Sequence, residues 1–258
     1  MKVSASNPIV DGKMPHLKLR KGDITPIVLL PGDPSRVEFF KDLCDDYKII
    51  SKNREYVVGV GKYNGVPITV CSTGIGAAST EIAVIELIQL GAKALIRIGG
   101  TGSIKEDINP GEMIITTGSM RRGGSSWFYA PPEYPAVASY NIVSALVNTC
   151  KYKNINCHTG IGASVGSYYA GQGREAFGKK LYQEDLIEQY QKMNVINLEM
   201  ETETILTLAN IFGIDAGSIC VVHGNRVTDE WIEDFKPYQM KMLEIALDTV
   251  VELDKIYS

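Results

Sequence analysis

The sequence lacks any excess of positive charge. Its 258 residues carry 26 Lys plus Arg against 30 Asp plus Glu, which gives a formal net charge of -4. This balance provides no long-range attraction to nucleic acid or to an anionic membrane, so we expect neither as a partner. Any anionic ligand would have to be held by a few local cations.

Long hydrophobic runs and metal-binding spacings are also missing. Residues 1–25 are polar, contain no apolar stretch long enough for a signal sequence, and no later segment approaches a membrane span. The five cysteines are odd in number and lack the spacing of metal ligands. We therefore expect a cytoplasmic protein with reduced thiols and no metal site. No Gly-x-Gly-x-x-Gly follows the first apolar run, which argues against a dinucleotide-binding dehydrogenase.

Short apolar runs alternate with helix-length amphipathic segments. The runs bounded by Gly, Pro or Asn predict buried strands at 27–30, 56–60, 66–71, 94–98, 113–117, 195–198 and 218–222. Helices are predicted at 77–90, 141–150, 201–212 and 238–256. This order predicts a single α/β domain over residues 1–258, with a mixed central β-sheet flanked by helices and ligands bound where loops leave the strand ends.

Two arginine-bearing segments are candidates for binding an anion. Gly32 and Arg36 follow the first predicted strand, where turn N–H groups, a helix start and a guanidinium suit phosphate, although an ordinary turn with a solvated arginine fits equally well. Arg97 lies inside an apolar strand, and a buried guanidinium needs either a carboxylate or an anionic ligand. Gly99 and Gly100 beside it leave the backbone open to close approach.

Two further segments offer groups that bind sugars and bases. Gln172 and Arg174, preceded by Tyr168, could pair with the O2, N3–H and O4 edge of uracil while the aromatic ring stacks on its face, although a polar surface loop is the simpler interpretation of this segment alone. Glu199 and Glu201 end an apolar run, and carboxylates suit the hydroxyls of ribose. One of the two acids could instead serve only as a partner of the helix dipole.

Seven segments, taken in order, resemble the nucleoside phosphorylase family, and within it the branch that acts on uridine. They are Gly32-Asp33-Pro34-Ser35-Arg36, Asn53-Arg54-Glu55-Tyr56, Ser72-Thr73-Gly74-Ile75-Gly76, Arg97-Ile98-Gly99, Tyr134-Pro135-Ala136-Val137, Gly171-Gln172-Gly173-Arg174 and Glu199-Met200-Glu201. The resemblance spans nearly the whole chain. It implies a nucleoside phosphorylase-like fold and the reversible phosphorolysis of uridine to uracil and ribose 1-phosphate in pyrimidine salvage. It implies no cofactor, because phosphate is a co-substrate.

The resemblance also implies a role for each site residue. The phosphate group would be held by Gly32, Arg36, Arg97, Gly100 and Thr101, with Arg54 reaching in from a neighbouring subunit. Ribose would contact Glu199, Met200 and Glu201, with His16 crossing the subunit interface to the 5′ hydroxyl. Uracil would contact Tyr168, Gln172 and Arg174, so that Arg174, Gln172 and Arg97 are the catalytic residues. The active sites would be shared across a homodimer interface, commonly with three dimers forming a hexamer.

The chain departs from the family pattern at Gly100, where such enzymes usually carry a threonine whose hydroxyl contacts phosphate and sugar. Thr101, or the backbone N–H groups at 100 and 101, could replace that contact. A non-catalytic nucleoside-binding protein is therefore one alternative. Another is a purine nucleoside phosphorylase of the same fold, which would need an Asp after the late strand, where this chain has His223-Gly224-Asn225-Arg226 and only later Asp229. A nucleosidase that uses water would leave the three arginines without an anion.

Overall fold

The computed structural model describes residues 4–6, 8–180 and 183–257. Its strands are β1 (Ile27–Leu30), β2 (Asp45–Asn53), β3 (Tyr56–Tyr63), β4 (Val66–Cys71), β5 (Ala94–Ser103), β6 (Met113–Arg122), β7 (Ala136–Val137), β8 (Cys157–Val165), β9 (Asn197–Glu199), β10 (Asp215–Asn225) and β11 (Glu230–Trp231). Its helices are α1 (Ser35–Glu38), α2 (Ala77–Leu90), α3 (Tyr140–Tyr152), α4 (Leu186–Lys192), α5 (Thr202–Phe212) and α6 (Lys236–Tyr257), with short 3-10 turns at Phe39–Asp42, Ser125–Phe128 and Ala170–Gln172.

The described strands form one mixed sheet in the order β11-β10-β6-β8-β9-β5-β1-β4-β3-β2, with β7 paired to β6. Strand β10 also pairs with β5, so the pairings β5–β10–β6–β8–β9–β5 close into a ring. Strands β1, β4, β5 and β10 run parallel to their partners in this series, so their carboxyl ends lie at the same edge of the sheet. Polar residues that follow these strands are thereby gathered in one place.

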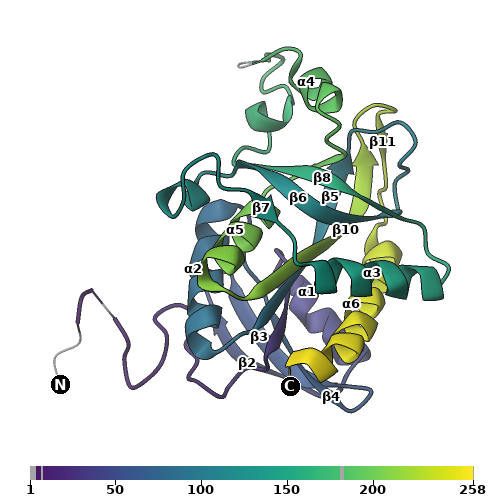
Figure 1. Ribbon diagram of the computed structural model, residues 1–258. Helices are drawn as coiled ribbons and strands as arrows, with labels where there is room; N and C mark the ends of the chain where they lie inside the picture. Colours follow the sequence, from purple (N-terminus) through teal and green to yellow (C-terminus); the bar gives the residue numbers. More distant parts are fainter. Residues whose placement is uncertain (1–3, 7, 181–182, 258) are drawn as a thin grey trace.

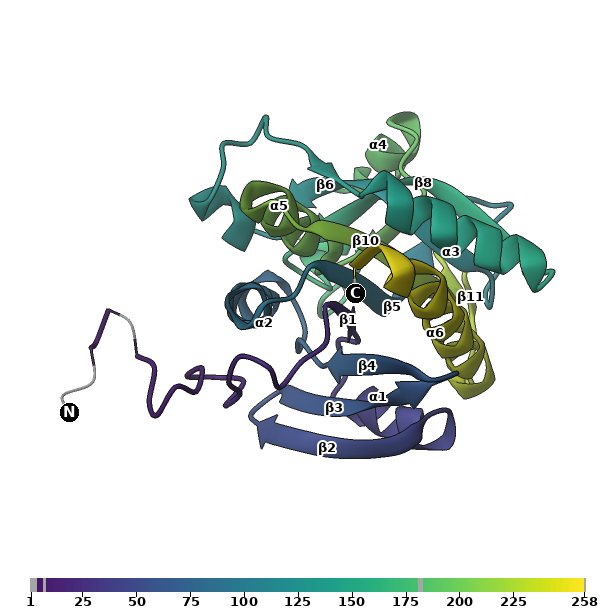
Figure 2. The same cartoon turned by 60° about the horizontal axis from the view of Figure 1, so that its bottom comes forward.

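Helices cover both faces of the central strands, with α2 and α5 on one side and α3 and α6 on the other (Figures 1 and 2). Side chains of a strand alternate between faces. In β1, Leu29 packs in the core with Leu243 of α6, whereas Val28 packs in a second core with Leu87 of α2. Because both faces are buried, β1 is entirely apolar, and the first half of β5, residues 94–98, is apolar apart from Arg97.

These observations confirm the predicted fold class. The strands at 27–30 and 66–71 and the helix at 77–90 have the predicted bounds, and that helix ends at Gly91, which adopts a left-handed conformation with φ of 107°. The strand predicted at 195–198 is shorter and lies at Asn197–Glu199. Strands β2, β7, β8 and β11 and helix α4 were not predicted. No helix in the described ranges is long and apolar enough to span a membrane.

Candidate functional site

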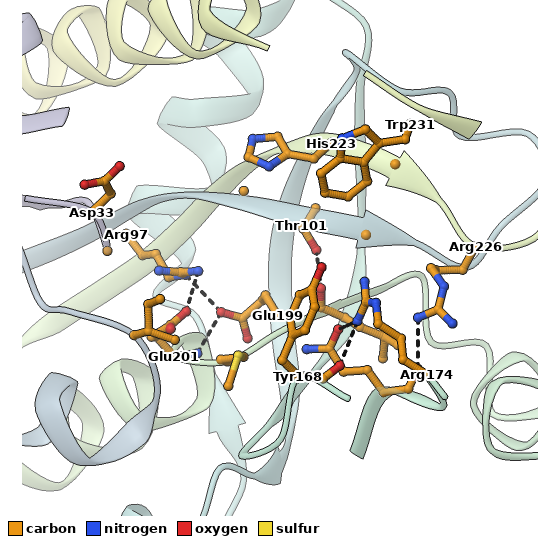
Figure 3. A pocket seen from close by; sticks show the side chains of 18 of the residues that line it. Asp33, Arg97, Thr101, Tyr168, Arg174, Glu199, Glu201, His223, Arg226 and Trp231 are labelled. Atoms are coloured by element: carbon orange, nitrogen blue, oxygen red, sulfur yellow. Dashed lines mark hydrogen bonds and ion pairs between the residues drawn. The ribbon is translucent and has the colours of Figure 1, made fainter. Parts of the chain in front are cut away.

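A pocket of about 900 Å³ opens at the shared carboxyl edge of the parallel strands. Its walls come from the loops after β1 and β4, the second half of β5, the end of β10 and β11, and from two segments near β8 and β9. Figure 3 shows Arg97 beside Glu199 and Glu201 at one end of this pocket, and Arg174 against Tyr168 at the other. The topology thus brings together residues that lie far apart in the sequence.

Nearly all the residues predicted for the site line this pocket. They are Gly32, Arg36, Arg97, Gly100, Thr101, Tyr168, Gln172, Arg174, Glu199, Met200 and Glu201. The two predicted site residues outside it are His16 and Arg54. Arg54 is exposed in the tight turn between β2 and β3, where its φ is 55°. Both were expected to reach the site of a neighbouring subunit, and that role stays a prediction.

Arg97 forms a buried ion-pair network with both acids of the site. Its Nε lies 2.9 Å from Oε2 of Glu199, and its Nη2 lies 2.6 Å from Oε2 of Glu201. Burial opposes the charge of Arg97, but Glu201 and Glu199 outweigh it and raise the pKa of the guanidinium. Burial raises the pKa of Glu201, and Arg97 counteracts this shift. The salt bridge that the sequence left open as an alternative is therefore present.

Backbone N–H groups and one hydroxyl complete the partners of the two acids; the hydroxyl is that of Ser164, which donates to Oε1 of Glu199. Oε2 of Glu199 accepts from the N–H groups of Glu201 and Thr202, each at 2.9 Å, at the start of α5. Oε1 of Glu201 accepts from the N–H of Gly76 at 2.6 Å, at the start of α2. These contacts fix the orientation of both carboxylates, which line the pocket.

Arg36 has a different environment, because no described carboxylate lies within ion-pair distance of it. Its Nε and Nη2 donate to the side-chain oxygen of Gln239 at 3.2 and 2.9 Å when the amide of Gln239 takes the orientation that satisfies both groups. Burial, and then the charge of Arg97, lower the pKa of Arg36. A half-buried guanidinium held by a neutral amide leaves a positive charge at the pocket wall that suits an anion.

The three residues predicted to hold the base are in mutual contact. The side chain of Gln172 is buried, and its Oε1 accepts from Nη1 of Arg174 at 2.5 Å. The guanidinium of Arg174 lies 3.9 Å from the ring centroid of Tyr168 and also donates to its carbonyl oxygen at 2.9 Å. Arg226 donates to the carbonyl oxygen of Gln172 at 2.9 Å. Arg226 had received little weight from the sequence, and its contact supports the loop that carries Gln172.

Thr101, predicted as a substitute for the threonine missing at position 100, has its hydroxyl engaged within the protein. Oγ1 donates to the carbonyl oxygen of Leu198 at 2.8 Å and accepts from Nδ2 of Asn197 at 2.9 Å. A hydroxyl has one proton, so in this arrangement none is left to donate to phosphate. Thr101 lines the pocket, and the expectation that it replaces the missing phosphate contact stays a prediction.

His223 explains the glycine at position 100. A Cβ placed on Gly100 would lie 2.3 Å from Cε1 of His223, closer than real side chains approach. The imidazole stacks on Phe235 with ring centroids 4.4 Å apart and meets Trp231 edge-on at 6.2 Å. The sequence had given His223 little weight, and it had missed Trp231 and Gln239. The aromatic residues Trp231 and Phe235 are visible in the sequence after the strand that became β10, but nothing in the sequence connects them to position 100.

His16 is held at the protein surface by a buried acid. Its Nδ1 lies 2.7 Å from Oε1 of Glu86 in α2, and its backbone N–H donates to the same carboxylate at 3.0 Å. The N–H of Leu17 donates to Oε2 of Glu86 at 2.7 Å. Glu86 thus anchors the segment before β1 and sets the direction of the His16 ring.

No group of three or more His, Cys, Asp or Glu side chains within the described ranges has an arrangement that could hold a metal ion. The pocket instead combines a cationic wall at Arg36, paired carboxylates and an amide-guanidinium pair. These groups suit an anion, hydroxyl donors and a polar ring edge respectively.

Comparison with known proteins gives a consistent result. The phosphorylase superfamily matches residues 26–252. A uridine phosphorylase from Thermococcus kodakarensis is 43% identical over 232 residues, which cover 89% of this chain and 84% of that protein. A uridine phosphorylase from Escherichia coli is 40% identical over 220 residues, covering 83% and 87%. A guanosine phosphorylase from Halorubrum lacusprofundi is 34% identical over 250 residues, covering 93% and 99%.

Proposed function

This chain belongs to the phosphorylase superfamily, and from that premise we propose that it is a uridine phosphorylase, a pentosyltransferase that converts uridine and phosphate to uracil and ribose 1-phosphate. The observation that carries the proposal is the contact of Gln172, Arg174 and Tyr168 in the same pocket as Arg36. One end of the pocket suits a uracil edge and the other suits phosphate. The substrates are uridine and phosphate, and the reaction needs no cofactor.

The base end supplies donors and acceptors that match uracil. Oε1 of Gln172 has two lone pairs, so it can accept from N3–H of uracil as well as from Arg174, while the amide N–H groups of Gln172 donate to a carbonyl. Arg174 donates to the other carbonyl. As the glycosidic bond breaks, negative charge grows on the ring and strengthens these hydrogen bonds, so Arg174 and Gln172 stabilise the transition state more than the bound substrate.

The phosphate end orients the nucleophile. Phosphate held by Arg36 and the N–H groups near Gly32 attacks the anomeric carbon from the face opposite uracil, and the sugar inverts. Its negative charge also stabilises the developing positive charge of the sugar. Glu199 and Glu201 accept hydrogen bonds from the ribose hydroxyls. Arg97 holds both carboxylates and, through them, sets the sugar in line with phosphate.

The subunit arrangement is part of the proposal. His16 and Arg54 lie outside the pocket of their own chain, and we assign them to the 5′ hydroxyl and the phosphate of a neighbouring subunit, in a dimer that is repeated three times in a hexamer. A mixture of Arg36→Ala and Arg54→Ala chains, each inactive alone, should recover activity after dissociation and reassociation, because some sites then carry both arginines. No recovery would contradict sharing. We place the enzyme in cytoplasmic pyrimidine salvage.

A purine nucleoside phosphorylase is the second candidate, because Asp229 lines the pocket and a guanosine phosphorylase is among the relatives. Asp229 is exposed and lies in a turn with φ of 58°, whereas Gln172 is buried. Asp229→Asn should therefore leave uridine cleavage nearly unchanged while Gln172→Ala impairs it. The reverse order of effects would favour the purine assignment.

The reaction itself is tested by product analysis. Purified protein with uridine should release uracil only when phosphate is present, with one ribose 1-phosphate formed for each uracil. Release of free ribose without phosphate would indicate hydrolysis and contradict the proposal. Uridine binding without turnover at any phosphate concentration would support a binding protein instead.

A further inference from the structure

The proposed reaction gives no task to His223, although its ring lines the pocket. We propose that an imidazole N–H of His223 donates a hydrogen bond to the phosphate co-substrate, and that residue 100 is glycine so that the ring can reach this position. The inference rests on the proposed function, because phosphate is the ligand it names. It adds a catalytic residue that contacts the nucleophile.

The first support is the fixed position of the ring. His223 lies near the end of β10, half-buried, between the face of Phe235 and the edge of Trp231. The stacked pair has an interplanar angle of 20°. Aromatic neighbours on two sides restrict rotation of the side chain, so little conformational entropy remains to be lost when a ligand binds. In Figure 3 the ring lies between Arg97 and Trp231, on the side of the pocket away from Tyr168.

The second support is the direction of the nitrogen-bearing edge. The atoms of His223 nearest to a Cβ built on Gly100 are Cε1 at 2.3 Å, Nδ1 at 2.7 Å and Nε2 at 2.8 Å. Both nitrogens therefore flank the point where the ring approaches strand β5, three residues beyond Arg97. Any side chain at position 100 would push this edge away. Position 100 therefore requires glycine, because the imidazole edge of His223 approaches the backbone there too closely for a side chain.

The third support is the link to Arg36. In the orientation in which the side-chain oxygen of Gln239 accepts from Arg36, that same oxygen lies 3.5 Å from Nε2 of His223, at the outer limit of a hydrogen bond. The histidine and the unpaired guanidinium thus share one buried amide at the same wall. Burial, and then the positive charge of Arg36, lower the pKa of His223 to about 4, so the ring is neutral near pH 7 and carries one N–H, which the proposal places on Nδ1 because Nε2 faces the oxygen of Gln239. A bound dianion would offset both the unpaired charge of Arg36 and its repulsion of the ring.

The alternative contact for His223 is the base, because Trp231 and Arg226 lie on its other side. The uracil edge already has Gln172 and Arg174, whereas among the described residues Arg36 has one neutral partner, Gln239. The phosphate end of the pocket therefore has the greater need of a further hydrogen-bond donor. The two assignments differ in which Michaelis constant a substitution changes.

The test combines two substitutions with steady-state kinetics. His223→Ala removes the donor and should raise KM for phosphate about tenfold or more, as expected for a lost hydrogen bond to a charged group, while KM for uridine changes by less than about threefold. His223→Asn keeps an N–H near the position of Nδ1 and should restore part of the loss. An unchanged KM for phosphate with a raised KM for uridine would overturn the proposal.

Gly100→Ala provides the matched test of the space argument. It should raise KM for phosphate about as much as His223→Ala, because the added methyl displaces the ring. The double variant Gly100→Ala, His223→Ala should be no worse than His223→Ala alone, because no ring remains to be displaced. Additive losses in the double variant would overturn the claim that the two positions act together.

Direct binding separates this inference from the proposed function. Phosphate should raise the melting temperature of the wild-type protein, and His223→Ala should need about tenfold more phosphate for the same shift. This result would support the inference even if uridine were not cleaved. Equal phosphate responses of the two proteins would refute the inference even if uridine phosphorolysis were established.

Discussion

Replacement of Arg97 by methionine tests the charge network at the centre of the site. The side chain is only 3% exposed and contacts Glu199 and Glu201 at 2.9 and 2.6 Å. Methionine has a similar length but no charge, so both carboxylates stay buried without their cation. Removal of one partner of a buried ion pair costs about 3–5 kcal/mol. In a chain of this length that corresponds to a fall in Tm of roughly 6–20 °C.

The pH dependence of stability in Arg97→Met identifies the cause of its lower free energy of unfolding. Burial already raises the pKa of Glu201 above the ordinary 4.5, and Arg97 opposes that shift. Without Arg97 the folded-state pKa rises further, so the folded variant binds a proton that the unfolded chain releases. Stability linked to such a group is fully present below the unfolded pKa and is lost as pH rises through the folded pKa. The loss in free energy of unfolding of Arg97→Met relative to the wild-type protein should therefore be smaller at pH 5 than at pH 8.

The assay is urea unfolding in phosphate-free buffer, followed by tryptophan fluorescence at both pH values. The control is Lys192→Met, which breaks an exposed pair with Glu188 at 2.8 Å and should change the unfolding midpoint little. A deficit for Arg97→Met below about 1 kcal/mol, or one that does not change with pH, would refute the assignment of Arg97 as the partner of two buried carboxylates.

Three further predictions concern the base end, the amino-terminal segment and His223. Arg174→Ala should lower kcat/KM for uridine on the order of 10²-fold or more, because a charged donor to the leaving group is lost, and a near-normal steady-state rate would contradict this role. Glu86→Ala should destabilise the protein by about 1–3 kcal/mol and speed proteolysis before β1, because the His16 and Leu17 N–H groups lose their acceptor; unchanged cleavage would contradict it. The pKa of His223 is about 4 in the folded protein against 6.5 in the unfolded chain, so its contribution to the free energy of unfolding is fully present above pH 6.5 and falls by on the order of 2–3 kcal/mol toward pH 4. Denaturation measurements on His223→Phe should show a correspondingly weaker fall in stability with pH, and a fall equal to that of the wild-type protein would contradict the lowered pKa.

Much of the fold could be predicted because buried parallel strands leave a clear pattern. The runs that became β1, β4 and the first half of β5 are apolar except for Thr69 and Arg97, since most of their side chains are buried on both faces. Strand β8 was missed because it contains His, Thr and two glycines, and no hydrophobic period marks it. It is held in the sheet by pairing with β6, which the local sequence does not reveal.

The site could be predicted as a set of residues but not as a set of contacts. Gln172 and Arg174 are close in sequence, so their cooperation was expected and their contact is present. Whether Arg97 would face acids or an anion depended on how β5 and β9 pair, which the strand patterns alone did not show. The fit of His223 against Gly100 arises where β10 lies beside β5, and a lone histidine in the sequence gives no sign of it.

The most direct test of the proposed activity is a comparison of kcat/KM for uridine, guanosine, inosine and thymidine with saturating phosphate, each repeated with phosphate omitted. The account predicts phosphate-dependent cleavage with uridine strongly preferred over both purine nucleosides. Preferred cleavage of guanosine or inosine would contradict the assignment of Gln172 and Arg174 to a uracil edge.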